Sequence, residues 1–291
     1  MKVANIVVFH KNPTSIERLL SAASHPAFDF YLHLDRKVNL QPFKHLSTFP
    51  QTRFVSKRIP VRWAGFSQVE AFISCMDDIS DSGIKYEFIN LLSGQDYPIK
   101  PPELIYQYLS QHKKSSFMLC ETPPSRWWNH AIKRYSHYHF IDYGFKGRYR
   151  LGLALTKILP AREFPLPLTL YGGPYASYWI LSMDAALYIH RYLKKMNQHK
   201  LFFKHTWAPD EFLIHTILMN SEFKESVVQE NFHYIDRSQG GSRPKILTTA
   251  DLPILKETNK FFARKFDPAV DSLVLDLIDN EILLKENRLR V

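Results

Sequence analysis

Short apolar runs alternate with stretches of helical periodicity through the first 120 residues, and this alternation limits the fold more than any other feature. The runs predicted as strands cover residues 3–9, 28–34, 53–56, 86–92 and 117–120. Helical patterns lie between them, over residues 14–23, over residues 67–79 behind a capping box of Ser67 with Glu70, and after Pro101 and Pro102. Repetition of strand, helix and strand predicts an α/β fold, with a largely parallel sheet and helices on its faces.

Two polar segments directly follow predicted strands. Residues 9–11 (Phe-His-Lys) end the first apolar run, and residues 35–37 (Asp-Arg-Lys) follow the second. Ligands of parallel sheets bind outside the carboxyl ends of the strands. We therefore expect both segments to line a ligand site.

The chain carries an excess of positive charge. Its 291 residues include 38 Lys and Arg against 28 Asp and Glu, a formal net charge of +10. This charge predicts an anionic partner without identifying it. Nucleic acid, an anionic membrane surface, a polyanionic glycan and a nucleotide diphosphate all fit.

Cysteine usage and hydropathy predict the compartment. Cys75 and Cys120 are the only cysteines and lie in no pairing motif, which predicts reduced thiols in a cytosolic protein. The apolar run at residues 3–9 is too short for a signal-peptide core or a membrane span, and no later stretch reaches 18 uninterrupted apolar residues. We therefore expect a protein that neither carries a visible export signal nor spans a membrane.

Residues 121–172 are rich in Arg, Lys, His, Trp and Tyr. A basic aromatic segment suits stacking on a sugar or a base as well as contact with phosphate. His137 and His139 could share a metal, but no Cys or acidic residue stands at ligand spacing, so we expect surface or stacking histidines. Gly172 and Gly173 predict either a turn or a close approach of the backbone to a bound sugar.

Helical patterns resume in the remainder of the chain, residues 173–291. Helical patterns cover residues 183–195 and 209–219, a short helix begins at Asp251, and an amphipathic helix lies near the end. A Gly-Gly-Ser-Arg-Pro-Lys loop at residues 240–245 precedes the basic segment at residues 261–267. No internal repeat or low-complexity linker divides the chain, which fits one large domain or two intimate ones.

Several common catalytic motifs are absent from the sequence. It contains no GxGxxG, GxxxxGK[ST], HExxH or GxSxG, which removes the usual sequence support for dinucleotide oxidoreductases, P-loop NTPases, zincin proteases and α/β-hydrolases. It also contains no Asp-x-Asp triplet, the pair with which many nucleotide-sugar transferases hold a divalent metal. If the protein handles a diphosphate, we expect cationic side chains to take the place of the metal.

Two groups of charged residues allow both a structural and a chemical interpretation. Asp210 and Glu211 follow Pro209 and either favour a helix N-terminus through its dipole or supply a general base that removes a proton from a sugar hydroxyl. Arg264 and Lys265 either form a solvated basic step or clamp a pyrophosphate. In the second case Arg243 would join the clamp.

Seven segments of the chain resemble, in the same order, the motifs of one known family. They are VVFHK at 7–11, LD at 34–35, WAGFS at 63–67, NLLSGQDYPIK at 90–100, YWILS at 178–182, PDEF at 209–212 and FARKFD at 262–267. Together they resemble glycosyltransferase family 14, which contains the core-2/I-branching N-acetylglucosaminyltransferases and the peptide O-xylosyltransferases. The segments at 90–100 and 262–267 are the most specific.

The resemblance implies a GT-A-like, Rossmann-type nucleotide-sugar-binding fold with a mixed, mainly parallel sheet. It also implies inversion at the anomeric carbon, a UDP-sugar donor and no cofactor or divalent metal. Glu211 matches the catalytic base of the family, and Arg264 with Lys265 matches the basic pair at the donor diphosphate. The other implied site residues are Val8 and Asp35 near the nucleotide, Arg243 near the diphosphate and Glu121 at the acceptor sugar.

These expectations combine into one predicted function. A single GT-A-like domain over residues 1–291, with a nucleotide-binding half (1–120) and an acceptor- and diphosphate-binding half (121–291), would move N-acetylglucosamine or xylose from a UDP-sugar to a glycan hydroxyl. The animal enzymes of the family carry a membrane anchor and disulfides, and we expect neither in this protein. The resemblance therefore implies a bacterial form in the cytoplasm, loosely held on the inner membrane at most. Its acceptor would be a surface-polysaccharide or lipid-linked saccharide.

Two other classes compete with this interpretation. A polyanion-binding or nucleic-acid-binding protein without catalytic activity would explain the net charge and the basic aromatic segment, but it leaves Glu211 and the apolar strands without a purpose. A glycoside hydrolase needs paired carboxylates on opposite sides of one bond, which the sequence neighbours Asp210 and Glu211 cannot supply. The transferase interpretation expects a UDP-sugar and a saccharide as partners, and no nucleic acid.

Overall fold

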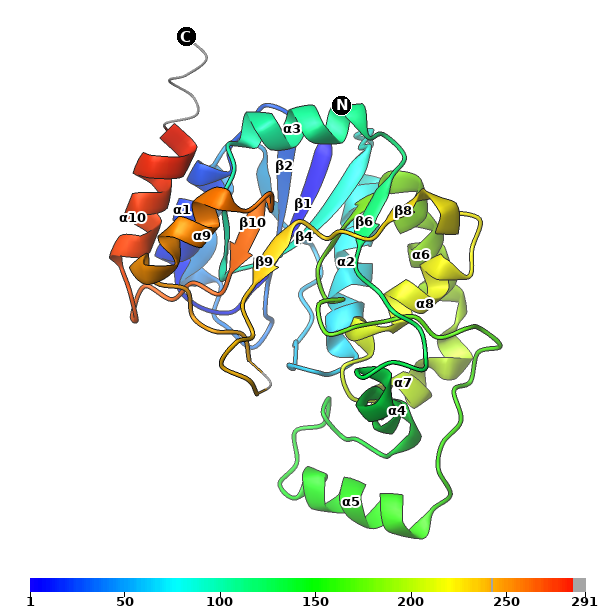
Figure 1. The fold of residues 1–291 in the computed structure, drawn as a ribbon. Coiled ribbons are helices and arrows are strands. Elements are labelled where there is room, and N and C mark those ends of the chain that lie inside the picture. The colour runs from blue at the N-terminus through cyan, green and yellow to red at the C-terminus, as the bar shows by residue number, and fades with distance from the viewer. Residues whose placement is uncertain (242, 285–291) are drawn as a thin grey trace.

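A seven-stranded sheet forms the centre of the computed structural model, which describes residues 1–241 and 243–284 (Figure 1). Its strands, in spatial order, are β3 (Thr52–Phe54), β2 (Phe28–Leu34), β1 (Val3–Phe9), β4 (Phe88–Ser93), β7 (Trp179–Ser182), β6 (Ser116–Met118) and β8 (Val227–Val228). The first four strands run parallel to one another, and β6 is parallel to β8. β7 runs antiparallel to both of its neighbours, β4 and β6.

The order β3-β2-β1-β4 is that of the first four strand positions of a Rossmann fold. The expected GT-A-like, Rossmann-type α/β fold with a mixed, mainly parallel sheet is confirmed. The strands predicted at residues 3–9 and 28–34 match β1 and β2 to the residue. The three other predicted strands differ from β3, β4 and β6 by one or two residues at their ends.

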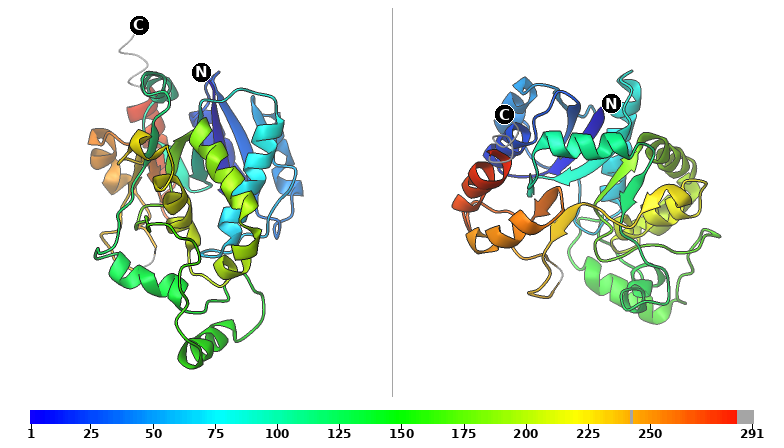
Figure 2. Two further views of the ribbon diagram at one scale, coloured as in Figure 1. Left: turned by 90° about the vertical axis from the view of Figure 1, so that its right-hand side faces the viewer. Right: turned by 45° about the horizontal axis from the view of Figure 1, so that its top comes forward.

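Helices cover both faces of this sheet (Figures 1 and 2). On one face lie α2 (Ser67–Asp81), α6 (Met183–Lys195) and α8 (Leu213–Met219), and on the other lie α1 (Pro13–Ala22) and α3 (Pro102–Gln111). β1 contributes to both cores, because Ala4 and Ile6 belong to the first and Val3 and Val7 to the second. Burial on both faces explains why β1 is a continuous apolar run.

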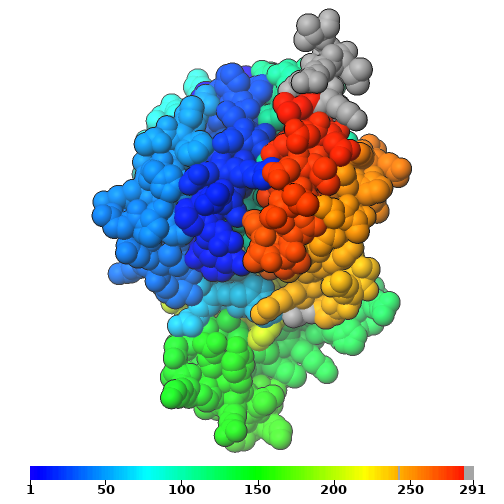
Figure 3. Space-filling view, turned by 90° about the vertical axis from the view of Figure 1, so that its left-hand side faces the viewer, coloured from blue at the N-terminus to red at the C-terminus, as the bar shows by residue number. Residues whose placement is uncertain are grey.

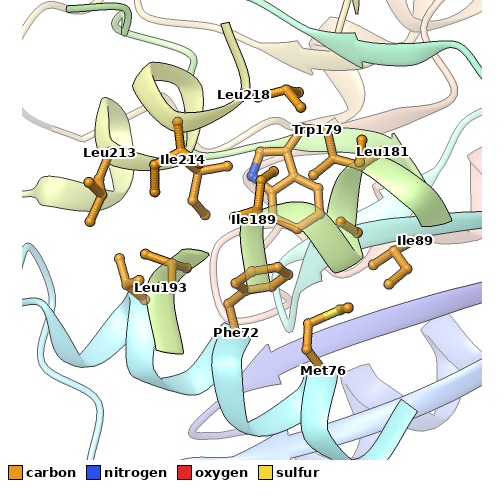
Figure 4. Packing of buried hydrophobic residues seen from close by; sticks show 14 of the residues in the cluster. Phe72, Met76, Ile89, Trp179, Leu181, Ile189, Leu193, Leu213, Ile214 and Leu218 are labelled. Carbon is orange, nitrogen blue, oxygen red and sulfur yellow. The ribbon is translucent and has the colours of Figure 1, made fainter. Parts of the chain in front are cut away.

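The larger core is centred on β7. Figure 4 shows the indole of Trp179 between Phe72 and Met76 of α2 and Ile189 of α6. Trp179 is fully buried, and its ring meets that of Phe72 edge to face, with the centroids 5.3 Å apart. This packing fixes β7, and with it the chain that enters β7 from residue 172.

A second, three-stranded sheet joins segments far apart in the sequence. It contains β5 (Asp96–Pro98), β10 (Phe262–Arg264) and β9 (His233–Ile235), with β10 antiparallel to β5 and parallel to β9. Arg264 lies opposite Asp96 in this register. The two segments most specific in the family resemblance, residues 90–100 and 262–267, are therefore paired strand to strand.

The remaining elements of the described residues are helices and short turns. They are α4 (Trp128–Ser136), α5 (Arg148–Ile158), α7 (Lys200–Lys204), α9 (Leu252–Glu257), α10 (Leu273–Ile278), a π-helical turn (Asp279–Leu283), and 3₁₀ turns at Gln41–Thr48, Asn197–His199, Pro209–Glu211, Lys224–Ser226 and Thr249–Asp251. No helix within the described ranges is long and apolar enough to cross a membrane. The predicted division into halves at residue 120 stays a prediction.

The predicted capping box of α2 is wrong. Ser67 lies inside the first turn of the helix, and its hydroxyl donates a 2.6 Å hydrogen bond to Asp142 Oδ1. Asp142, 75 residues away in the sequence, supplies the carboxylate for this helix N-terminus, so the side chain of Glu70 is not needed there. Glu70 instead forms an ion pair with Lys200 at 2.6 Å.

The helix predicted at residues 209–219 is interrupted. A 3₁₀ turn covers Pro209–Glu211, the backbone of Phe212 leaves the helical region (φ −147°), and α8 begins at Leu213. The carbonyl of Glu211 accepts a hydrogen bond from the Gly173 amide at 3.2 Å, so it does not continue a helix. This interruption separates Glu211 from the helix that follows.

Candidate functional site

Glu211 ends a 3₁₀ turn at the edge of the molecule's larger core. The amide of Ala208, which precedes this turn, donates a 2.7 Å hydrogen bond to the carbonyl of Ala64. The Glu211 side chain is 19% exposed, and its Oε2 accepts a 2.5 Å hydrogen bond from Arg134 Nη1. The carboxylate is thus held in a fixed direction while part of it stays accessible, as a general base requires.

Opposing influences act on the pKa of Glu211. Burial raises the pKa of this carboxyl above its usual value, whereas the positive charges of Arg134 and Arg237 lower it. The raised pKa makes the Glu211 carboxylate a stronger base than one in water. The arginines favour its charged form.

Asp210 lies in a different environment from its neighbour. Its Oδ2 accepts a 3.0 Å hydrogen bond from the Ser177 hydroxyl, and its buried Oδ1 has no hydrogen-bond partner within the part of the chain that the structure describes. Burial and the charge of Glu211 raise the pKa of Asp210 well above its usual value. Asp210 is thus a buried carboxyl that accepts a hydrogen bond from a serine, whereas Glu211 is the carboxyl that forms an ion pair with an arginine.

Lys265 lies in a cluster of positive charges. Burial lowers its pKa, and so do the charges of Arg264, Arg243 and Lys11. Among residues 1–241 and 243–284, neither Lys265 nor Arg243 forms an ion pair with an acidic side chain. We call Lys265, Arg264, Arg243 and Lys11 the cationic cluster. Lys11 pairs with Asp267 and Arg264 with Asp96, both at 2.9 Å, so the unpaired charge of the cluster is that of Lys265 and Arg243. This charge suits a bound anion such as a diphosphate.

Arg264 differs from Lys265 in that it has fixed protein partners. Its Nε donates a 2.9 Å hydrogen bond to Asp96 Oδ1, and its guanidinium lies 4.2 Å from the centre of the Tyr178 ring. The predicted basic pair thus divides into a guanidinium held by Asp96 and an ammonium without an acidic partner. The free charge of the pair belongs to Lys265.

The residues predicted near the nucleotide lie at the carboxyl ends of β1 and β2. The Val8 carbonyl accepts a 3.0 Å hydrogen bond from the Gly94 amide. Asp35 is buried, and its Oδ1 accepts a 2.9 Å hydrogen bond from the Lys37 amide. Partial burial and the charges of Lys11, Lys37 and Lys265 lower the pKa of His10, while the charge of Asp35 raises it. His10 therefore lies within electrostatic reach of both Asp35 and Lys265.

A cavity of about 340 Å³ lies beside the Glu211 turn. It is lined by Glu121, Arg126, Trp127, His130 and Pro174. We call it the Glu121 cavity. Arg134 connects it to the carboxylate, since its guanidinium lies 5.0 Å from the centre of the Trp127 ring while its Nη1 binds Glu211. Glu211 itself does not line the Glu121 cavity, and the connection between the two runs from Trp127 through Arg134.

Gly172 and Gly173 allow the main chain to approach Glu211 closely. The backbones of Glu121 and Gly172 form an isolated antiparallel bridge with hydrogen bonds of 2.8 and 3.1 Å. A Cβ at Gly172 would lie 2.6 Å from the Glu211 carbonyl oxygen, whereas one at Gly173 would meet nothing closer than 3.8 Å. Gly172 thus lies against the Glu211 turn of the protein, and its approach to a bound sugar stays a prediction. The predicted turn follows Gly173, whose carbonyl accepts a 3.2 Å hydrogen bond from the Ala176 amide.

Adjacent side chains connect the Glu211 turn to the cationic cluster. Ser177 donates its hydrogen bond to Asp210, and the next residue, Tyr178, stacks on Arg264. The charges of both Arg264 and Asp210 act on the pKa of Tyr178. The carboxyl pair and the cationic cluster therefore lie on two sides of the chain at residues 177–178.

The sequence analysis assigned no role to Arg134 or to Trp63, although Trp63 begins the segment WAGFS at 63–67. Arg134 lies in a basic aromatic segment in which nothing distinguishes it, and its partner Glu211 is 77 residues away. Trp63, with 60% of its surface exposed, meets Trp207 edge to face at a centroid distance of 5.6 Å. An exposed Trp beside the Glu211 turn offers a stacking surface for a sugar ring.

The paired histidines of the middle segment stack. The ring centroids of His137 and His139 lie 6.4 Å apart, and His139 also meets Trp207 at 5.7 Å. In the two described ranges, no group of three or more His, Cys, Asp or Glu side chains is arranged to hold a metal ion.

Comparison with known proteins identifies the family. The family profile of the Core-2/I-Branching enzymes matches residues 3–262. The chain belongs to this family. The resemblance to glycosyltransferase family 14 is thereby confirmed, whereas the roles predicted for individual residues stay predictions.

Relatives in the family include both kinds of transferase. Xylosyltransferase oxt of Drosophila melanogaster is 27% identical over 89% of this chain and 31% of its own length. A mouse beta-1,3-galactosyl-O-glycosyl-glycoprotein beta-1,6-N-acetylglucosaminyltransferase 3 is 26% identical over 95% of this chain and 67% of its own. The chain thus spans about a third of the length of the xylosyltransferases that it matches. Among solved structures, mouse xyloside xylosyltransferase 1 matches 90% of this chain and 97% of its own at 10% identity, with a TM-score of 0.42.

Proposed function

We propose that this protein is an inverting glycosyltransferase that moves a sugar from a UDP-sugar to a hydroxyl of a glycan acceptor. N-acetylglucosamine and xylose are the sugars favoured by the family membership and by the names of its relatives. One observation carries the proposal. An arginine-paired carboxylate, Glu211, lies beside an open cavity and is connected through residues 177–178 to a cluster of cations.

Glu211 is the proposed general base. An acceptor sugar in the Glu121 cavity would present a hydroxyl to the carboxylate, with Glu121 and Trp127 as contacts. Glu211 accepts the hydroxyl proton as the oxygen attacks the anomeric carbon, and the bond from that carbon to the UDP oxygen breaks. A single displacement of this kind inverts the configuration at the anomeric carbon.

The cationic cluster is the proposed site of the diphosphate. Negative charge accumulates on the β-phosphate as the glycosidic bond breaks, and fixed cations aimed there stabilise the transition state more than the ground state. Lys265 supplies the unpaired charge, Arg264 a guanidinium oriented by Asp96, and Arg243 a further cation. We propose that these cations make a divalent metal unnecessary. The uridine would lie at the ends of β1 and β2, near Val8 and Asp35.

The acceptor and the place of action belong to the same proposal. We infer that the acceptor is a lipid-linked saccharide or a surface polysaccharide of a bacterium. We also infer that the protein is cytoplasmic and binds peripherally to the inner membrane, without entering it as a spanning segment. The net charge of +10 supports attraction to anionic lipid. The protein would act without nucleic acid as a partner.

Transfer assays with Glu211→Gln test this proposal. The amide keeps the shape of the side chain but cannot accept the proton, so UDP binding should persist while transfer from UDP-N-acetylglucosamine or UDP-xylose is lost. Glu225→Gln, a change at an exposed glutamate in the 3₁₀ turn Lys224–Ser226, is the matched control and should transfer at the wild-type rate. Wild-type turnover by folded Glu211→Gln would remove Glu211 from the mechanism.

A further inference from the structure

Large apolar side chains gather on the surface of one short segment, residues 145–159. Six of them are at least 40% exposed: Phe145, Tyr149, Leu151, Leu153, Ile158 and Leu159. Leu153 and Ile158 reach 65% and 77%. The remaining described residues contribute only eight such side chains, spread over 1–132 and 201–284. An exposed apolar cluster of this density marks an interaction surface.

The helix in this segment, α5, exposes most of its large apolar side chains to solvent. Its side toward the protein carries Gly152 and Thr156, whose hydroxyl accepts a 3.1 Å hydrogen bond from the Tyr138 amide. A Cβ at Gly152 would lie 2.5 Å from the Tyr138 carbonyl oxygen, so the helix comes very close to residues 137–141 at this point. A cavity of about 190 Å³, which Leu153 also lines, lies beside this contact. The apolar side chains therefore lie on the side toward solvent, opposite to the usual arrangement of a surface helix.

Basic side chains accompany the apolar ones. Residues 143–162 contain five Lys and Arg and no Asp or Glu. Arg150 and Lys157 are seven residues apart, hence on the same side of α5, and both are exposed between the apolar side chains. Neither they nor Lys146 form an ion pair within residues 1–241 and 243–284. Exposed apolar side chains beside unpaired cations suit contact with an anionic bilayer, because the apolar groups leave water and the cations meet the negatively charged headgroups.

Fixed contacts hold the segment on both sides. Asp142, just before it, binds Ser67 at the start of α2. Arg162, just after it, donates hydrogen bonds to the carbonyls of His137, His205 and Phe202 at 2.9, 2.6 and 2.5 Å. The solvent-facing side of α5 is thus presented by an anchored element.

The position of α5 suits contact with a flat surface. It lies at the end of the molecule opposite the N-terminus, beyond α4, and the region around it projects as a separate lobe (Figures 1 and 3). α4 carries His130 and continues from Trp127, both of which line the Glu121 cavity. A surface in contact with α5 would therefore lie on the same end of the molecule as this cavity.

We propose that the outward side of α5 docks on a bilayer containing anionic phospholipid and brings the Glu121 cavity close to that surface. Apolar side chains such as Leu153 and Ile158 enter the acyl boundary, while Arg150 and Lys157 extend to the headgroup phosphates. The second half of this inference rests on the proposed transferase function. Docking there would give the cavity access to an acceptor attached to a lipid.

Vesicle co-sedimentation of the full chain tests the docking. We expect binding to vesicles of phosphatidylcholine with phosphatidylglycerol, and little binding to pure phosphatidylcholine. Leu153→Ser with Ile158→Ser, or Arg150→Glu with Lys157→Glu, should lower the apparent partition coefficient at least about tenfold. Leu201→Ser, at a side chain 61% exposed on α7, is the matched control and should bind as the wild type does.

The results separate docking from catalysis. Thermal unfolding and UDP binding of each variant establish that it is folded. Absence of wild-type binding to anionic vesicles, equal binding to both lipid compositions, or unchanged binding by both double variants would each overturn the proposal. Vesicle binding needs no turnover, so failure of the transferase proposal would leave this readout intact, and transfer to a soluble acceptor by the α5 variants should match the wild type.

Discussion

Arg134 sets the charge of Glu211, so its removal should move the pH dependence of transfer. Arg134 Nη1 lies 2.5 Å from Glu211 Oε2, and both side chains are mostly buried. A guanidinium at such a distance lowers the pKa of a carboxyl by about 1–3 units. In Arg134→Gln this influence disappears, while the burial that raises the pKa of Glu211 remains. The pKa of Glu211 should therefore rise by that amount.

The sign of the effect on the rate follows from the role of the base. Glu211 accepts a proton only when it is ionised, so kcat/KM falls as the pH drops below the pKa of the free enzyme's base. The acidic limb of the profile of kcat/KM against pH should move about 1–3 units toward higher pH in Arg134→Gln, equivalent to about 1.4 kcal/mol per unit. Above the new pKa the rate should recover most of its loss.

The assay needs a variant that removes a charge from the same helix without touching Glu211. Lys133→Gln meets this requirement, because Lys133 is the exposed neighbour of Arg134 on α4. Its profile should overlay that of the wild type. An acidic limb that stays in place in Arg134→Gln, or that moves equally in Lys133→Gln, would refute the reasoning.

Three further changes test the site. Glu211→Gln should lower kcat by roughly 10²- to 10⁴-fold in a transfer assay while calorimetry still detects UDP binding, and loss of both together would point to misfolding. Lys265→Ala should weaken UDP binding by about 2–3 kcal/mol in calorimetry and slow turnover, unlike Lys113→Ala at an exposed lysine. Gly172→Ala should lower the free energy of unfolding by about 1–3 kcal/mol in denaturant titrations, because its Cβ would meet the Glu211 carbonyl oxygen. Gly173→Ala should be tolerated, and equal stability of the two variants would contradict the packing described.

Local sequence patterns predicted most accurately those strands whose ends coincide with the ends of a buried apolar run. β1 and β2 lie in the middle of the sheet with both faces covered, so their apolar runs begin and end with the strands. β3, at the edge of the sheet, was predicted less accurately, because a half-buried strand has a weaker apolar signal. The interior strand β4 was also off by one or two residues at its ends, because the predicted run begins at Tyr86, which is buried but precedes the strand. The helix at residues 183–195 was predicted to the residue because its N-cap Ser182 and apolar face agree.

Contacts between distant segments account for what the sequence could not predict. Asp142 replaces the predicted cap of α2 from 75 residues away, and Arg134 reaches Glu211 across 77. The partnership of Arg264 with Asp96 spans 168 residues. No local pattern encodes such pairs. The resemblance nevertheless singled out Glu211 and Lys265 as site residues, because their motifs are recognisable without their partners.

The stereochemistry of transfer in excess chelator tests the central claim most directly. Wild-type protein would be incubated with an α-linked UDP-sugar, a panel of glycan acceptors and EDTA, and the anomeric proton coupling of the product would be measured by NMR. Glu211 as base and the cationic cluster at the diphosphate predict a β-linked product at an undiminished rate, and a rate roughly 10²- to 10⁴-fold lower from Glu211→Gln. An α-linked product, or activity that EDTA abolishes and manganese restores, would contradict the mechanism.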